Sequence, residues 1–409
     1  MKNKSKKHWI VMMICCLMSS ASIGLIINAM GVFYTPVAQS LGVMQGTVAA
    51  QGTITLILGA SMSFIVPKFL IKFSFKKILI VSALVASVST ALMGLVDNIV
   101  VFHLLGAIRG IFSAFFSMVP LTMIINNWFA KKHGLATSLV LGLSGMVGAV
   151  FSPIFATLIE NYGWELTYLV KGGILMLLCL PAIFYPFSLK PQDDGLLPYG
   201  MEEKIKVDEA AIFGLEFKRT ELTFICFLGF STLIAALTTI AHHLPGFAGS
   251  IGQSTTTGAL LLSAAMMGNV LFKVIIGLLS DAVGIIKSCL IMIAINIVGL
   301  VLLMTADTAE VLIIASFLFG ALFSVGSVGA ALLTKHFFGL DNFPKCYPFV
   351  AFIGGIGAAL ALAAIGYLYD FTDSYSLSFT VALIFHGFAM ILFVFIILKN
   401  SNQPEKNLY

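Results

Sequence analysis

The chain has 409 residues, of which 59% are hydrophobic and 10% are charged, and its formal net charge is +5. Its mean hydropathy of +1.04 lies far outside the range of soluble globular domains. This composition excludes water as the main solvent of the chain, and we expect a protein embedded in a lipid bilayer.

Twelve apolar stretches are long enough to cross a membrane. A helix of about 18 or more apolar residues covers a hydrocarbon core about 30 Å thick. The expected spans are residues 9–33, 45–66, 78–96, 99–125, 135–159, 166–187, 221–244, 256–279, 289–305, 311–334, 343–367 and 377–398. Several Lys residues precede the first span, as in a signal peptide, but its apolar run is too long and no small-residue cleavage site closes it. We therefore expect the first span to be retained.

The basic residues lie on one side of the expected membrane. All Lys and Arg residues except Arg109, Lys171 and Lys273 fall in the N-terminal segment, in or at the edges of the even-numbered loops, or in the C-terminal tail. The acidic residues of the opposite loops are Asp97, Glu160, Glu165, Asp307, Glu310, Asp370 and Asp373. Because basic loops stay in the cytoplasm, we predict a multi-pass protein of the cell (plasma) membrane with both termini cytoplasmic.

One long polar interruption, residues 188–220, divides the chain into two parts. It mixes Lys, Asp and Glu with Pro and Gly, which is typical of a cytoplasmic linker. We predict six-helix bundles over residues 1–187 and 221–409 on either side of it. The six Cys residues sit in or beside spans without metal-ligand spacing, so we expect neither a metal nor a cofactor.

Corresponding loops of the two bundles carry a degenerate repeat. The second bundle has the spacing Gly-x-x-x-Asp-x-x-Gly at Gly277, Asp281 and Gly284, whereas the first keeps only the basic residues of this loop. This loop spacing, the layout in two halves and Arg109 in the fourth span resemble the major facilitator superfamily. By that resemblance Gly277, Asp281 and Gly284 belong to a gating loop.

Three further segments resemble one branch of that superfamily. Residues 127–138, 142–153 and 190–200 are similar to segments of the oxalate:formate antiporter and the monocarboxylate transporters. The resemblance implies an all-α polytopic membrane protein with twelve transmembrane helices in two six-helix bundles, the major facilitator fold. It also implies that the bundles rock around a central substrate site near the membrane midplane.

Three cations lie within the spans. A charge near the bilayer centre costs at least about 2.5 kcal/mol, so such residues usually face a cavity. Arg109 lies near mid-membrane, and Lys273 about six residues before the end of the eighth span, whereas Lys171 is close enough to an outer end to snorkel. The spans hold no acid apart from Glu221 and Asp281 at their edges. Carbonyls or hydroxyls could satisfy these cations, but a substrate anion is the more economical partner.

The segment from Asn269 through Lys273 resembles an eighth-helix motif in which a basic residue contacts the substrate carboxylate. Relatives often carry Arg at the position of Lys273, and Lys enforces carboxylate geometry less strictly. The eleventh span lacks the second cation of the oxalate:formate antiporter, which favours a monoanion over oxalate. Arg109 could serve binding, coupling or helix packing, and Asn28 could line the cavity or bond another helix.

Proton coupling is less clear, because no Asp or Glu lies at mid-membrane. His243 and His103 are candidates for coupling or gating, although a structural histidine with its hydrogen bonds satisfied is the more common case for each. Symport could use the acid group of the substrate, and exchange needs no protein proton.

No constellation of catalytic or phosphate-binding residues indicates an enzyme. We predict a secondary transporter of a small organic anion, a monocarboxylate, by proton symport or anion exchange. The alternatives are a proton-coupled exporter of drug-like or other small molecules, which would need cavity acids, and a non-transporting membrane sensor on the same scaffold. We expect a monomer whose partners are the anion, the lipid bilayer and, in symport, protons, with no nucleic acid.

Overall fold

The computed structural model describes residues 2–62, 64–201, 221–339 and 342–401, and the regular elements of this part of the chain are all helices. The elements of the first part are α1 (Lys2–Ser19), η1 (Ser20–Asn28), η2 (Gly31–Phe33), α2 (Tyr34–Leu41), α3 (Gln45–Met62), α4 (Val66–Lys72), α5 (Phe75–Leu92), η3 (Met93–Leu95), α6 (Ile99–Ser113), η4 (Ala114–Phe116), α7 (Met118–Trp128), α8 (His133–Phe184) and η5 (Pro191–Asp194). Those of the second part are α9 (Leu222–Thr238), η7 (Thr239–His243), α10 (Leu244–Ser250), α11 (Thr255–Val283), α12 (Ile285–Thr305), α13 (Ala309–Phe319), α14 (Leu322–Ser324), η8 (Val325–Gly329), α15 (Ala330–Phe338), α16 (Phe343–Thr372) and α17 (Ser376–Ser401).

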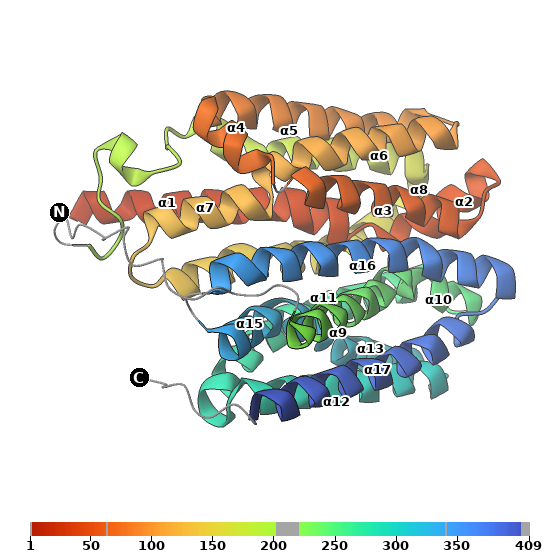
Figure 1. Cartoon of the computed structure of the whole chain (residues 1–409). Helices are drawn as coiled ribbons and strands as arrows, with labels where there is room; N and C mark the ends of the chain where they lie inside the picture. Colours follow the sequence, from red (N-terminus) through yellow and green to blue (C-terminus); the bar gives the residue numbers. More distant parts are fainter. Residues whose placement is uncertain (1, 63, 202–220, 340–341, 402–409) are drawn as a thin grey trace.

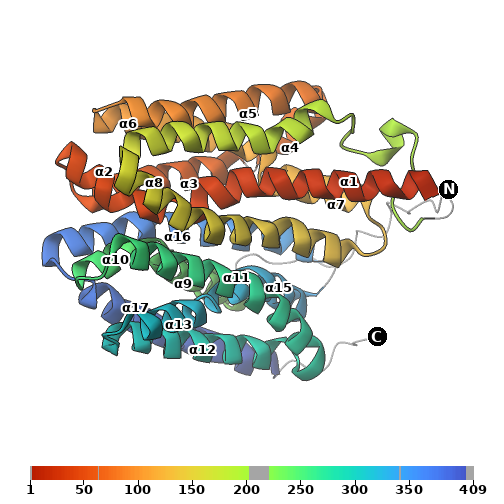
Figure 2. The same cartoon turned by 180° about the vertical axis from the view of Figure 1, so that it is seen from behind.

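Ten helical segments of the described residues are long and apolar enough to cross a membrane. One of them, Leu139–Phe184, has 46 residues and would measure about 70 Å as a single helix, more than twice the hydrocarbon thickness. It contains the non-helical residue Gly163 (φ 85°, ψ 161°), where the chain turns back (Figure 2), so it crosses twice. With the 18-residue helix α3 the described chain makes twelve crossings, and the predicted all-α polytopic fold is confirmed.

The helices gather in two groups (Figure 1). Helices α1 to α8 lie on one side and α9 to α17 on the other, and α3 packs against α16 while α8 packs against α11. Helix α1 begins and α17 ends at the same end of the molecule, which we call the terminal end. Helices α2 and α10 lie at the opposite end, which we call the distal end (Figure 1).

The first crossing is irregular. Helix α1 passes into the π-helical segment η1, and beyond Met30 the 3-10 helix η2 leads into α2. The hydroxyls of Ser20 and Ser22 donate hydrogen bonds to carbonyls four residues earlier, at 2.8 and 2.9 Å. Such bonds bend helices and compete with the regular backbone ladder. The predicted end of this span at residue 33 is too early, because helical structure continues to Leu41.

Part of the predicted linker is folded against the first group of helices. The backbone N–H of Tyr199 donates to the carbonyl of Trp128 at 2.7 Å. The Lys7 amine forms an ion pair with the Asp194 carboxylate at 3.1 Å. Residues 188–201 therefore cover the terminal ends of α1 and α7, and the rest of the predicted linker lies outside the described residues.

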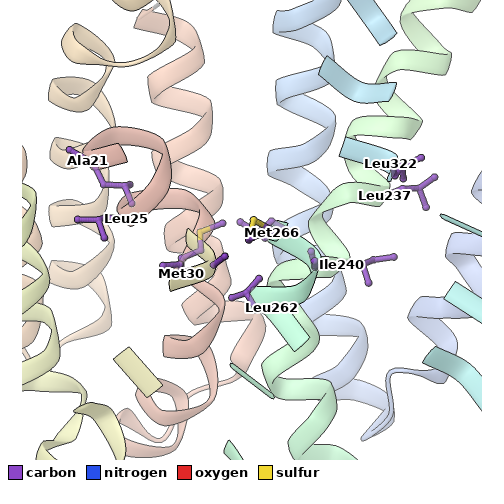
Figure 3. Packing of buried hydrophobic residues seen from close by; sticks show 14 of the residues in the cluster. Ala21, Leu25, Met30, Leu237, Ile240, Leu262, Met266 and Leu322 are labelled. Carbon is purple, nitrogen blue, oxygen red and sulfur yellow. The ribbon is translucent and has the colours of Figure 1, made fainter. Parts of the chain in front are cut away.

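The two groups meet through apolar side chains at mid-height (Figure 3). Met30, which follows η1, points toward Leu262 and Met266 of α11, and all three are at most 4% exposed. This apolar layer divides the interface between the groups into a distal and a terminal portion.

Candidate functional site

At the distal end, polar groups tie the two helical groups together. The carboxylate of Asp370 in α16 accepts backbone N–H bonds from Gln45 at 2.9 Å and Gly46 at 2.7 Å, at the first turn of α3. The hydroxyl of Tyr375 donates to Oε1 of Gln45 at 3.1 Å. A carboxylate at a helix N-terminus satisfies otherwise unpaired donors and is favoured by the helix dipole. Asp370 was expected in an outer loop, and the structure instead places it within α16.

Glycines allow the same elements to approach closely. A Cβ atom on Gly46 would lie 2.5 Å from Cγ of Tyr367 and 2.6 Å from its backbone nitrogen. A Cβ atom on Gly31 of η2 would collide with the carbonyl of His242. We call these contacts of Gly31, Gln45 and Gly46 with His242, Tyr367, Asp370 and Tyr375 the distal gate, which is closed in this structure.

Helices α8 and α11 cross at the level of the apolar layer and diverge on its terminal side. Ser263 donates to the carbonyl of Ala149 at 2.7 Å. A Cβ atom on Gly145 would lie 2.6 Å from Val270. Nearer the terminal end, Cβ atoms on Gly142 and Gly277 would meet nothing within 4 Å. The two helices therefore pack less closely below their crossing.

Lys273 lies on the same face of α11 as Gly277, one turn before it. It follows Met266 by about two helical turns, so the two side chains share one face. Lys273 is half-buried, and no carboxylate of the described residues lies within ion-pair distance of its amine. Helix α11 extends to Val283, so Lys273 lies about 15 Å from the helix end, deeper than the predicted end at residue 279 implied.

Asn269, one turn before Lys273, is an under-satisfied amide. The residue is 4% exposed, its Oδ1 has no hydrogen-bond partner, and its Nδ2 lies 3.9 Å from the Met266 sulfur. A thioether is a weak acceptor. The predicted pair of Asn269 and Lys273 therefore presents polar atoms with unused hydrogen-bonding capacity.

Arg109 is buried within the first group of helices and lacks a strong partner. It is 1% exposed. Its Nη1 contacts the Met93 sulfur at 3.4 Å, its Nη2 contacts the Thr55 hydroxyl at 3.3 Å, and its Nε has no partner. A guanidinium offers five donors and is best satisfied by a carboxylate. No carboxylate of the described residues forms an ion pair with it.

Lys171 does not snorkel, so that expectation was wrong. It is 0% exposed, and its amine has no hydrogen-bond partner. The amine lies 4.4 Å from the ring centroid of Phe33, 5.4 Å from that of Tyr168 and 5.9 Å from that of Phe155. These rings wall the amine off from the distal end and offer it cation–π contacts in place of water. The charge of Arg109 is near enough to repel it.

Asn28 forms a bond between helices, one of the two roles left open for it. Its Nδ2 donates to the carbonyl of Ser144 in α8 at 3.0 Å, and the side chain is 6% exposed. A Cβ atom on Gly148 would lie 2.5 Å from Cβ of Asn28, which shows how closely η1 and α8 pack.

The two candidate histidines each bond to a backbone carbonyl. Nε2 of His103 lies 2.8 Å from the carbonyl of Thr47, and Nε2 of His243 lies 2.8 Å from that of Leu362. The Nδ1 atom of His243 has no partner, and its ring lies 5.2 Å from that of Tyr34 beside the distal gate. These bonds fit structural histidines and leave a coupling or gating role of His243 and His103 as a prediction.

The loop motif contains one position that demands glycine. Gly284 has φ 85° between α11 and α12, a conformation that other residues adopt only with strain. Asp281 is exposed in the last turn of α11, and it forms no ion pair with any side chain that the structure describes. A gating role of Gly277, Asp281 and Gly284 therefore remains a prediction.

Sequence reasoning missed the environment of Lys171 and the partner of Asp370. Phe33 covers Lys171 from a distant crossing, and the first turn of α3 meets Asp370 across the two groups of helices. No spacing pattern links residues so far apart. The available signal was the charge of Lys171 within an apolar span.

Comparison with known proteins matches the chain as a whole to one protein family. The sequence profile of the Major Facilitator Superfamily matches residues 11–252 and 222–408. The chain is 24% identical over 391 residues to the MFS-type transporter YcxA of Bacillus subtilis (strain 168), covering 89% of each protein. It is 25% identical over 276 residues to monocarboxylate transporter 13 of Rattus norvegicus, covering 65% of this chain and 60% of that one. It is 24% identical over 355 residues to monocarboxylate transporter 12 of Xenopus laevis, covering 80% and 75%.

Two solved structures share the fold. The nucleoside transporter NupG superposes with a TM-score of 0.71 at 13% identity, covering 96% of this chain and 99% of that one. A bacterial homologue of the human lysosomal transporter Spinster, in an inward-facing and unoccupied conformation, superposes with a TM-score of 0.72 at 13% identity, covering 96% and 97%. At these identities the likeness establishes the fold alone.

Proposed function

Since this chain belongs to the Major Facilitator Superfamily, we propose that this transporter carries a small organic anion, a monocarboxylate, across the cell membrane by alternating access. The bundles of residues 1–187 and 221–409 would rock about the central layer, joined by residues 188–220. The basic residues at the terminal end support a cytoplasmic location for both termini.

The observation that carries the proposal is the unpaired amine of Lys273, one turn from Gly277 on the loosely packed part of α11. An ammonium group at this depth is unfavourable without a partner, and the described residues offer it no carboxylate. A substrate carboxylate that enters from the terminal end would neutralise the amine. Asn269 lies one turn away, with an unpartnered oxygen and a weakly bonded amide nitrogen.

The relatives support the same substrate class. Two of them carry the name monocarboxylate transporter, at 25% and 24% identity. An exporter of organic cations would need acidic side chains in the cavity, and near Lys273 none lies within ion-pair distance in the part of the chain described. Proton symport and anion exchange both fit this proposal.

The test is counterflow in liposomes that contain the purified protein. The panel comprises formate, acetate, lactate, pyruvate and oxalate. We expect counterflow of at least one monocarboxylate, reduced at least tenfold by Lys273→Gln, because a hydrogen bond to a charged group contributes about 1.5–3 kcal/mol. Lys273→Arg keeps the charge and should retain most of the activity.

Lys399→Gln is the matched control, since it removes the same charge from an exposed position at the end of α17. It should leave counterflow unchanged. Robust uptake of an organic cation that is indifferent to Lys273→Gln, with no carboxylate exchange, would contradict the proposed function.

A further inference from the structure

The first group of helices holds a second positive site, behind the distal gate. We propose that Lys171 and Arg109 form an anion-binding subsite that receives the substrate carboxylate when the distal gate opens. This inference rests on the proposed function and adds Lys171 as a binding residue. Lys273 would then serve the terminal side and Lys171 the distal side of one transport path.

Unused hydrogen-bonding capacity is the first argument. The Lys171 amine has no hydrogen-bond partner at 0% exposure, and the Nε atom of Arg109 has none at 1% exposure. The hydroxyl of Tyr34, at 3% exposure, is also buried without a partner. A buried polar group without a hydrogen bond is unfavourable by about 1–3 kcal/mol, and a charged one by more. Three such groups in one region indicate a ligand that supplies acceptors.

Charge is the second argument. Lys171 and Arg109 repel each other, and Arg109 also interacts electrostatically with the hydroxyls of Tyr34 and Tyr168. Neither cation has an ion-pair partner among the residues that the structure describes. A single carboxylate between them would remove the repulsion and accept hydrogen bonds from both. A neutral molecule would supply acceptors but would leave the repulsion.

The cover of this subsite is attached to the gate. Phe33, whose ring lies 4.4 Å from the Lys171 amine, belongs to η2 together with Gly31, which abuts the His242 carbonyl. The next residue, Tyr34, packs against the ring of His243 at 5.2 Å. Opening the distal gate removes the support of η2, so the Phe33 ring over Lys171 can move aside.

The test combines thermal unfolding with counterflow on the full chain. Lys171→Met fills a similar volume without charge, so without ligand it should unfold at a higher temperature than the wild type. We expect the same variant to lose the stabilisation that the transported carboxylates of the panel give to the wild type. Its half-saturating concentration in counterflow should rise at least threefold. Lys171→Arg, which keeps the charge, should retain part of both effects.

The control is Lys77→Met, which removes an exposed charge at the terminal end of α5 and should change neither measurement. If Lys171→Met keeps its carboxylate stabilisation and its half-saturating concentration changes less than threefold, Lys171 is a packing residue and the inference is wrong. That outcome leaves the Lys273 result intact. If the wild type itself moves no carboxylate of the panel, the proposed function fails instead.

Discussion

The distal and terminal portions of the interface between the two helical groups are built differently. At the distal end, Asp370 holds the first turn of α3 through two hydrogen bonds, and Gly46 lets α3 touch α16. At the terminal end, α8 and α11 separate, and Cβ atoms on Gly142 and Gly277 would meet no neighbour within 4 Å. Specific contacts therefore hold the helices together at the distal end. At the terminal end α8 and α11 lie farther apart.

The interior cations follow the same division. Lys171 and Arg109 lie behind the closed end at 0% and 1% exposure, whereas Lys273 is half-buried beside the separated helices. Under the proposed function, an anion from the terminal side would meet Lys273 in this conformation, while Lys171 and Arg109 stay buried. The packing at the distal end, rather than the local sequence, would then decide which charge is available.

The largest effect is expected from a substitution that keeps the distal end from closing. In Gly46→Ala the new methyl group would lie 2.5 Å from the Tyr367 ring and 2.6 Å from its backbone nitrogen. Overpacking a tight contact costs about 1–3 kcal/mol, and the upper end applies here because two backbones must separate. We expect carboxylate counterflow to fall at least a hundredfold, measured in liposomes beside the wild type.

Gly387→Ala is the control, because a Cβ atom at this position of α17 meets nothing within 4 Å. It should transport like the wild type. Wild-type counterflow by Gly46→Ala would show that transport does not require the close approach of α3 and α16.

A smaller effect is expected from weakening the gate without filling it. Asp370→Asn replaces a carboxylate that accepts two N–H bonds with an amide that can keep only one of them. We expect the closed distal state to lose about 1–2 kcal/mol. Thr35 of α2 is half-buried beside Gln45 and Tyr375 of the gate, so a thiol introduced by Thr35→Cys should then react about 5–30 times faster with a membrane-impermeant maleimide.

The reference for that measurement is Thr35→Cys in the otherwise unchanged chain, and the chain without it gives the background of the native thiols. An unchanged labelling rate in the Asp370→Asn chain would mean that the two hydrogen bonds do not hold the gate.

Much of the fold could be predicted because membrane insertion is a local property of sequence. Each crossing is a run of apolar residues, and the reversal at Gly163 falls between two predicted spans. Boundaries were less predictable: α11 continues to Val283 and the first crossing to Leu41, because polar ends extend helices beyond the apolar run.

The candidate site was only partly predictable, because its contacts join residues that are far apart in the sequence. The charge of Lys273 within a span is visible in the sequence, but its neighbours are not. Lys171 was expected to reach the headgroups, and it is held inside by Phe33 and Phe155 from other crossings. Asp370 was expected in a loop, and its partners lie at the first turn of α3. Contacts between distant crossings depend on how helices pack, which no local pattern encodes.

The smallest expected effect concerns Asn28, which lies between the two ends of the interface. Its hydrogen bond to Ser144 joins η1 to the part of α8 where Gly145 meets α11. Such bonds between membrane helices contribute about 0.6 kcal/mol and at most about 1.7 kcal/mol. We expect the unfolding temperature of Asn28→Ala to be a few degrees lower than that of the wild type. Its counterflow should stay within threefold of the wild type, and its stabilisation by carboxylates should be unchanged.

Asn161→Ala provides the comparison, because that side chain is exposed and bonds the carbonyl of Thr157 within its own helix. It should leave thermal unfolding and counterflow unchanged. If Asn28→Ala instead unfolds like the wild type but loses the stabilisation by carboxylates, Asn28 contacts the substrate. The central layer would then be part of the binding site, and the division into a distal and a terminal cation would describe two ends of a single continuous site.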